Sequence, residues 1–258
     1  MRIIIAPAKK MSADTDSLPC QGLPRFLPQA EQLLERLREL SYEELKALWR
    51  CSDRLAALNV RRLQTMDLRR GLTPALLAYE GIQYQYMAPH VFSIDEFTYV
   101  EEHLRILSGF YGILRPFDGV APYRLEMQAK LSCCGAKDLY GFWGSRIAEA
   151  LFAETACVIN LASQEYSLCV SPYVPPEARL VTCVFGQRKN GKIVEKGTLC
   201  KMARGEMVRF LAERRATEPE QLRDFDRLGY RFCGEASRRD TYVFVQEGGA
   251  EGSSAGWA

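Results

Sequence analysis

Apolar positions along this 258-residue chain follow a helical spacing in some segments and an extended spacing in others. The apolar run at 2–6 ends at a proline and predicts a central strand. At 29–40 the leucines recur three and four residues apart, which places them on one face of an amphipathic helix. Capping-box patterns or helical spacing predict further helices at 41–50, from Ser93 onward, at 138–154, at 199–214 and after Thr217.

Strand patterns gather in the second half of the chain. The continuous apolar run at 157–162 suits a buried strand. Residues 179–197 predict a hairpin that turns at Asn190–Gly191, and residues 230–246 predict a final pair of strands. Because helices and strands are mixed without strict alternation, the expected class is α+β, with a mixed sheet and surrounding helices.

Composition bounds the organisation and the location of the protein. We expect one compact domain over 1–246, followed by a disordered tail at 247–258 that is rich in glycine, serine and alanine. No apolar run approaches the roughly 20 residues that span a bilayer, so a cytoplasmic protein with no membrane partner is expected. The net charge of +2 indicates no partner by itself, and only local clusters of charge are informative.

The nine cysteines are scattered, and the chain has only two histidines and no CxxC motif. No pair of these residues has the spacing of a zinc site, so no metal or other cofactor is predicted. Reduced, partly buried thiols are the expected state. The adjacent residues Cys133 and Cys134 leave redox sensing as a minor hypothesis.

The segment between residues 50 and 70 is basic, because it contains six arginines and only two aspartates. The residues at 58–60 interrupt the helical pattern, so two short helices and a tight turn are expected within 41–66, as in a helix-hairpin-helix. Such an element directs backbone amides and cations at phosphates and binds DNA with little sequence preference. Its predicted DNA-binding residues are Arg50, Arg54, Asn59, Arg61 and Arg62. The alternative is an exposed pair of helices with solvated arginines.

Three other cationic residues have sequence positions that suit contact with a ligand. Lys9 follows the first predicted strand, and Lys201 and Arg204 share one face of a predicted helix. The stretch at 107–127 combines glycines and prolines with two arginines and two carboxylates, a composition that fits either a surface loop or a binding edge. The chain has no GxSxG, GxxxxGK[ST] or GxGxxG motif, which disfavours a hydrolase triad and the familiar nucleotide-dependent enzymes.

From residue 1 to about 246 the chain resembles the YaaA family of peroxide-stress-resistance proteins. The resemblance is carried by "APAKK", "SDRLAALN", "HLRILSGFYGILRPFD", "PYRLEM", "KDLYGFWG", "VINLASQEY" and "KMARGEMVRF". It implies an α+β fold with a positively charged cleft and a helix-hairpin-helix, DNA binding, and a link to damage by peroxide and intracellular iron. The implied hairpin falls on Ser52–Arg62, where "ALN" at 57–59 replaces the family's "GIN", and "APAKK" replaces "SPAKT" while keeping Lys9.

Within the cleft that the resemblance implies, we hypothesise which residues form the lining. They are Lys9, Tyr111, Arg115, Tyr123, Arg124, Glu126, Lys201 and Arg204. Arginine and lysine would contact phosphates, and Tyr111 or Tyr123 would stack on an exposed base. Asp118 and Glu126 would orient the arginines or, in an enzyme, act on a proton. Carboxylates repel a phosphate backbone, so DNA binding alone does not explain them.

The expected function is therefore that of a cytoplasmic DNA-binding protein of the peroxide stress response. It would recognise the shape of the backbone rather than a base sequence, with distorted duplexes as candidate targets, and a monomer is favoured. The alternative is an enzyme acting on a nucleobase, a nucleotide or a DNA lesion in the same cleft, with Lys9, Asp118 and Glu126 as the candidate catalytic residues. Direct iron binding is poorly supported by the residues present.

Overall fold

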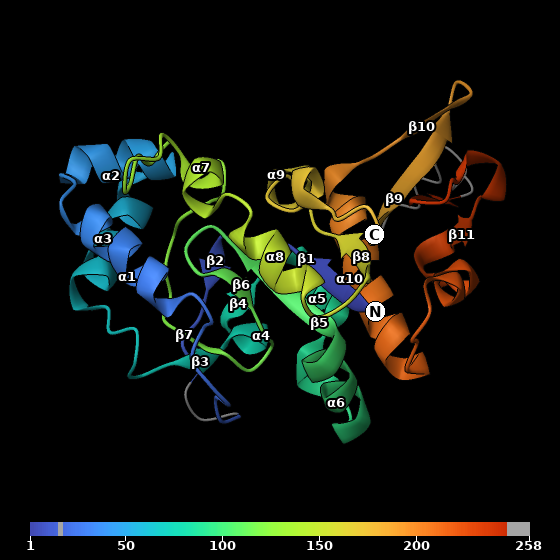
Figure 1. Cartoon of the computed structure of the whole chain (residues 1–258), viewed down its shortest axis with the longest axis horizontal. Helices are drawn as coiled ribbons and strands as arrows, with labels where there is room; N and C mark the ends of the chain where they lie inside the picture. The colour runs from blue at the N-terminus through green and yellow to red at the C-terminus, as the bar shows by residue number, and fades with distance from the viewer. Residues whose placement is uncertain (15–17, 247–258) are drawn as a thin grey trace, which may run out of the picture.

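The computed structural model describes residues 1–14 and 18–246, and its centre is an eight-stranded mixed sheet (Figure 1). Five neighbouring strands pair in parallel: β5 (Leu104–Ser108), β1 (Arg2–Ile5), β8 (Cys157–Leu161), β9 (Arg179–Lys189) and β12 (Thr241–Gln246). Three strands pair antiparallel with them: β6 (Gly112–Leu114), β10 (Lys192–Val194) and β11 (Tyr230–Phe232). Two short ladders lie outside this sheet: β2 (Lys10–Met11) with β4 (Tyr79–Glu80), and β3 (Thr73–Pro74) with β7 (Gly119–Val120).

The order of the parallel strands reverses at β1. The chain first adds β5 on one side of β1 and then crosses to add β8, β9 and β12 on the other side. In chain order the five strands therefore read 2-1-3-4-5, an arrangement of doubly wound sheets that has its switch point between β1 and β8. Ligands of open α/β sheets bind beyond the carboxyl ends of the strands at such a point, so the topology itself marks a position for a site.

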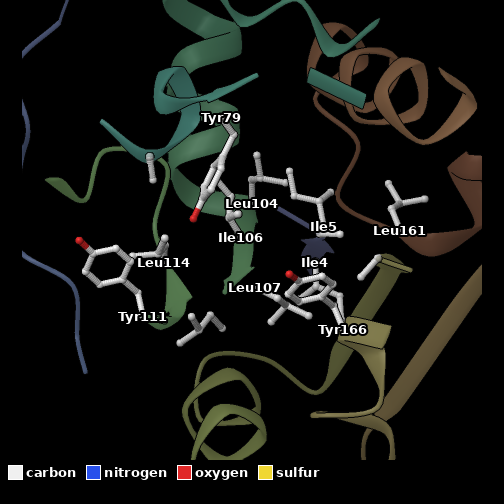
Figure 2. Close-up of a cluster of buried hydrophobic side chains, with 14 of the residues drawn as sticks. Ile4, Ile5, Tyr79, Leu104, Ile106, Leu107, Tyr111, Leu114, Leu161 and Tyr166 are labelled. Atoms are coloured by element: carbon white, nitrogen blue, oxygen red, sulfur yellow. The ribbon is translucent and has the colours of Figure 1, made fainter. Parts of the chain in front are cut away.

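The mixed sheet and the surrounding helices are confirmed, but the mostly parallel pairing makes the fold α/β rather than the expected α+β. Ile3, Ile4 and Ile5 are all fully buried although successive strand residues point to opposite faces, so both faces of β1 are covered. Figure 2 shows this core around β1 and β5. The class was hard to foresee because the connection from β1 to β5 holds several helices and short ladders instead of one crossover helix.

The helices account for most of the rest of the described chain. They are α1 (Leu27–Arg38), α2 (Tyr42–Trp49), α3 (Asp53–Thr65), α4 (Ala75–Ala78), α5 (Ile82–Met87), α6 (Ile94–His103), α7 (Leu139–Trp143), α8 (Arg146–Phe152), α9 (Gln164–Ser167) and α10 (Gly197–Arg214). Short 3-10 helices cover Pro89–Val91, Ser171–Tyr173, Pro219–Asp224, Arg227–Gly229 and Gly234–Ala236. Figure 1 shows α1, α2 and α3 together at one end of the long axis and β11 at the other.

Several local predictions can be compared with these elements. Both predicted capping boxes, at Ser41 and Ser93, are present at the starts of α2 and α6. The helix predicted at 138–154 is divided into α7 and α8, with Gly144 at a φ of 50° between them. The helix expected after Thr217 is a short 3-10 helix. The tail predicted at 247–258 lies outside the described residues.

The turn predicted at 58–60 is wrong. Helix α3 runs without a break from Asp53 to Thr65, and the chain turns earlier, at Arg50, which has a left-handed φ of 44°. Asn59 lies inside α3, is buried, and donates from its side-chain amide to the carbonyl oxygen of Leu55 at 2.8 Å. Because this bond satisfies the amide within the helix, Asn59 neither breaks the helix nor reaches a ligand. Its predicted roles as a turn residue and as a DNA-binding residue are therefore both wrong.

Helix α10 packs against α5 at very short range, and Gly205 makes this possible. A Cβ atom at position 205 would lie 2.1 Å from the carbonyl oxygen of Gln83 and 2.9 Å from the backbone nitrogen of Met87. Both are backbone atoms, which cannot move aside as a flexible side chain can. The contact therefore fixes the position of α10, and with it Arg204, relative to the start of α5.

We expect Gly205→Ala to destabilise the protein by about 2–3 kcal/mol, since overpacking of a tight contact costs this much, and to lower Tm by ~5–10 °C. Gly197→Ala in the same helix is the matched control, because nothing lies within 4 Å of its added Cβ, and it should leave Tm within ~1 °C. Differential scanning fluorimetry measures both values. Equal Tm values for the two variants would show that the α5–α10 contact is not tight.

Candidate functional site

A cavity of about 400 Å³ lies beyond the carboxyl ends of β1 and β8, at the switch point of the sheet. The loop that follows β1 supplies one wall and the residues after β8 supply another. The start of α5, the segment 123–126 and helix α10 complete the lining. We call this cavity the switch-point pocket.

The switch-point pocket is lined by five cationic side chains and three carboxylates. These are Lys9, Lys10, Arg124, Lys201 and Arg204, with Glu80, Glu126 and Glu165. Lys9 Nζ lies 2.8 Å from Glu126 Oε2, and Lys10 pairs with Glu80. Lys201 is exposed and forms no ion pair with any residue that the structure describes. The cationic excess favours a ligand that carries negative charge.

Three tyrosines contribute to the lining of the switch-point pocket. Tyr84, Tyr123 and Tyr166 line it and are almost fully buried. The Tyr123 hydroxyl lies 2.7 Å from Ser108 Oγ and 2.9 Å from the Tyr79 hydroxyl, and the Tyr84 hydroxyl donates to the carbonyl oxygen of Ala6 at 3.1 Å. Burial raises the pKa of Tyr123 to about 12, so this ring is neutral at physiological pH. With their hydroxyls occupied, Tyr84 and Tyr123 offer a ligand mainly apolar ring surface.

Three buried nitrogen atoms around the switch-point pocket lack a hydrogen-bond partner. They are Gln83 Nε2, Arg124 Nε and Arg204 Nε, and Trp49 Nε1 is the fourth such atom among the described residues. A buried donor without a partner costs roughly 1–3 kcal/mol, and more where the group is charged. All four are donors, so a ligand rich in acceptor atoms would remove this cost.

Glu165 is the carboxylate of the switch-point pocket whose pKa is raised, whereas the hydrogen bond with Lys10 lowers the pKa of Glu80. Burial raises the pKa of Glu165, and the neighbouring charge of Glu126 adds to the rise. Lys9 and hydrogen bonds from the backbone amides of Gln128 and Met127 act in the opposite direction. The Gln128 amide donates to Glu165 Oε1 at 3.2 Å. Glu165 is thus a candidate for proton exchange with a ligand, as well as a hydrogen-bond acceptor.

A second cavity, of about 430 Å³, adjoins helix α2 and shares Glu126 with the switch-point pocket. We call it the α2 pocket; its charged lining residues are Arg36, Glu44, Arg50, Glu126 and Lys130. Arg124 links the two cavities, because it donates to the carbonyl oxygen of Trp49 at 3.3 Å and to Glu126 Oε1 at 3.4 Å. Trp49, whose Nε1 lacks a partner, also lines the α2 pocket.

The structure brings six of the eight predicted cleft residues together in the switch-point pocket. They are Lys9, Tyr123, Arg124, Glu126, Lys201 and Arg204. Tyr111 is 1% exposed, and its hydroxyl accepts from the amide of Ala121 at 3.0 Å, so it cannot stack on a base and that prediction is wrong. Arg115 and Asp118 line a different cavity.

That third cavity, of about 570 Å³, lies near the amino ends of β1 and β5, away from the switch point. Arg105 is almost fully buried there and pairs with Glu154 at 2.5 Å. Asp118 Oδ2 accepts from the backbone amide of Arg115 at 2.8 Å. Burial raises the pKa of Asp118 to about 6, although that hydrogen bond and the nearby arginines oppose the rise. Asp118 therefore cannot act with Glu126 in one site as predicted.

The predicted DNA-binding residues of the basic segment differ in exposure. Arg50, Arg54 and Arg61 are exposed, and none of the three forms an ion pair within the described part of the chain. Arg62 is half-buried and donates to the carbonyl oxygen of Met11 at 3.2 Å. Asn59 is buried, as described above. Three of the five side chains are therefore available to a partner in solution.

Sequence reasoning missed Gln83 and Glu165 as site residues. Gln83 had no signal, because nothing in its neighbourhood predicts that α5 meets α10. Glu165 had one: it follows a buried strand in a polar turn, and the carboxyl ends of parallel strands converge at one edge of a sheet. That signal becomes useful only when the parallel pairing of β8 with β1 is known.

The vicinal cysteines line none of these three pockets, although Cys133 follows Ser132 of the α2 pocket. Cys133 Sγ is 3.5 Å from Cys134 Sγ, and burial raises the pKa of the Cys133 thiol to about 12. A thiol that is protonated at neutral pH is a poor nucleophile, which disfavours the redox hypothesis. In the ranges 1–14 and 18–246, no group of three or more potential ligand side chains could hold a metal ion. No helix in the same ranges is long and apolar enough to span a membrane.

Comparison with known proteins places the chain in a family. A family model described as "Peroxide stress protein YaaA" matches residues 1–236. The chain belongs to the YaaA family. A UPF0246 protein of Lachnoclostridium phytofermentans is 53% identical over 246 residues, which cover 95% of this chain and 96% of the relative. A UPF0246 protein of Lactiplantibacillus plantarum is 51% identical over 247 residues, 96% of this chain and 100% of the relative. The family resemblance found in the sequence is thus confirmed.

We expect Asp118→Asn to stabilise this YaaA protein at pH 7.5 and to have a smaller effect at pH 5. The folded-state pKa of Asp118, about 6, lies above the usual value of 3.8. The ionised Asp118 carboxylate therefore destabilises the folded state above pH 6. This loss of folding stability becomes smaller as the pH falls from 6 toward 4, because the carboxyl group is then protonated in the folded state. Asparagine can still accept the Arg115 amide hydrogen bond. Tm should rise by ~5 °C at pH 7.5, for a gain of about 2 kcal/mol. Destabilisation at pH 7.5 would contradict the assignment.

Proposed function

We propose that this YaaA protein binds the DNA backbone in the cytoplasm as part of the peroxide stress response. The observation that carries the proposal is the distribution of cations: two pockets that meet at Glu126 are lined with lysine and arginine, and the neighbouring helices α2 and α3 add exposed arginines. Phosphates are the anions that such a series of cations would bind at several points along one strand.

The α2–α3 pair would form one part of this surface. Arg54 and Arg61 are seven residues apart on α3, which places them on the same face two turns from each other. Arg50 lies at the end of α2 and also lines the α2 pocket. A DNA backbone that crosses α3 can thus continue past Arg50 toward Glu126 and the switch-point pocket. This path uses the predicted basic segment, with the turn at Arg50 in place of the turn predicted at 58–60.

We expect R54A/R61A to weaken binding to a plain duplex roughly tenfold and to reduce the slope of log K against log salt by ~2, because two phosphate contacts are lost. R238A/R239A is the matched control: both side chains are exposed, Arg239 accepts a hydrogen bond from Arg179 at the start of β9, and neither residue lines one of the three cavities. Fluorescence anisotropy over a series of salt concentrations measures both. Absence of DNA binding by the wild-type protein at low salt would refute the proposal.

An enzyme acting on a nucleotide is the second candidate, and Glu165 is the observation that favours it. Its raised pKa and its position beside Glu126 and Lys9 suit proton transfer to a bound ligand. Mass spectrometry of oligonucleotides and nucleotides incubated with the protein tests this candidate. A product that forms with the wild-type protein and not with Glu165→Gln would support it; unchanged substrates with excess protein would exclude it for those substrates.

A further inference from the structure

We infer that the switch-point pocket binds a single nucleotide, with its phosphate beside Arg204 and the amino group of its base beside Glu165. This inference rests on the proposed function and deepens it. The same nucleotide unit can come from two sources, an unpaired position in a DNA strand or a free nucleoside monophosphate. The chemistry of recognition is the same for both.

The phosphate end follows from the donors on α10, α5 and the segment 123–126. The side chains of Arg124 and Arg204 are only 11% and 14% exposed, and each has a buried Nε without a partner. Gln83, which is 6% exposed, adds a third unpartnered donor. Arginine held in this way suits the planar, bidentate recognition of phosphate, and Lys201 adds an unpaired charge at the rim.

The base end follows from the three lining tyrosines and from Glu165. Tyr84, Tyr123 and Tyr166 are 4%, 7% and 7% exposed, so each presents only part of its ring to the pocket, and a base would pack against this apolar lining rather than stack on an open ring face. Glu126 is paired with Lys9 and Arg124, but Glu165 forms no ion pair within the described residues and repels a phosphate, so a ligand made only of phosphate does not explain it. A carboxylate does accept a hydrogen bond from the amino group of cytosine. A nucleotide, with an anionic end and a donor-bearing base, uses both kinds of charge in the switch-point pocket.

The size of the cavity limits the ligand to one unit. A volume of about 400 Å³ falls near the lower end of the range for small-molecule sites, roughly 300–1,000 Å³, and a DNA duplex cannot enter it. A nucleotide in a strand must therefore leave the base stack before it can enter. Unstacking costs a few kcal/mol in a paired duplex and least where the base is already unpaired. Bubble-containing DNA should thus bind more tightly than plain duplex.

Isothermal titration calorimetry with four probes tests the inference: dCMP, dTMP, deoxycytidine and inorganic phosphate. We expect saturable binding of dCMP, and at least tenfold weaker binding of each of the other three, because dTMP lacks the amino group and the last two lack one end of the ligand. Arg204→Gln should weaken dCMP binding at least tenfold, whereas Lys192→Gln, which removes one charge outside the pocket, should not. Glu165→Gln should reduce the preference for dCMP over dTMP. An unchanged Tm confirms that each variant is folded.

Three outcomes would overturn the inference. Equal affinities for dCMP and dTMP would show that the pocket does not recognise the amino group of the base. Inorganic phosphate that binds as tightly as dCMP would show that the pocket is only an anion site. The absence of saturable nucleotide binding at millimolar concentration would show that the pocket binds no nucleotide. DNA binding without dCMP binding would overturn the inference and leave the proposed function standing. Binding of dCMP without DNA binding would support the inference, identify free nucleotides as the source and refute the proposed function.

Discussion

The parallel pairing of β1 with β5 on one side and β8 on the other is the constraint on which the rest of the structure depends. Because Ile3, Ile4 and Ile5 are buried on both faces, β1 must lie at the centre of the sheet. The chain then leaves β1 and β8 at the same edge, and this brings Lys9 beside Glu165 although they are far apart in the sequence. The close approach of α10 to α5 at Gly205 adds Arg204 and Gln83 to that edge.

The charges gathered at that edge are only partly compensated. Glu126 holds Lys9 and also accepts from Arg124, so one carboxylate orients cations from two segments. The buried Nε atoms of Arg124 and Arg204 remain without partners, and burial raises the pKa of Glu165. Protein cores rarely keep such groups without compensation. Their concentration around one cavity is the physical reason for assigning it a ligand with both acceptor and donor groups.

Much of this arrangement was open to prediction from the sequence. The apolar runs predicted β1 and β8, and the serine–glutamate pairs predicted the starts of α2 and α6. Six of the eight residues predicted to line the cleft do line the switch-point pocket. Long-range packing accounts for the failures. Tyr111 and Arg115 lie in the same stretch as Tyr123, but the turn between β5 and β6 places Tyr111 in the core and the loop after β6 places Arg115 at a different cavity. Asn59 resembles a turn residue, yet its side chain bonds within α3. Gln83 becomes a site residue only through the contact of α5 with α10.

The central claim is that one unpaired nucleotide of bound DNA occupies the switch-point pocket. Competition measures this most directly: the affinities of bubble-containing and plain duplex DNA are compared by anisotropy with and without saturating dCMP. The account predicts that dCMP lowers the affinity for bubble DNA to that for the plain duplex and leaves the plain duplex unaffected, since only the bubble can place a nucleotide in the pocket. An affinity for bubble DNA that is unchanged while dCMP fills the pocket would contradict the account.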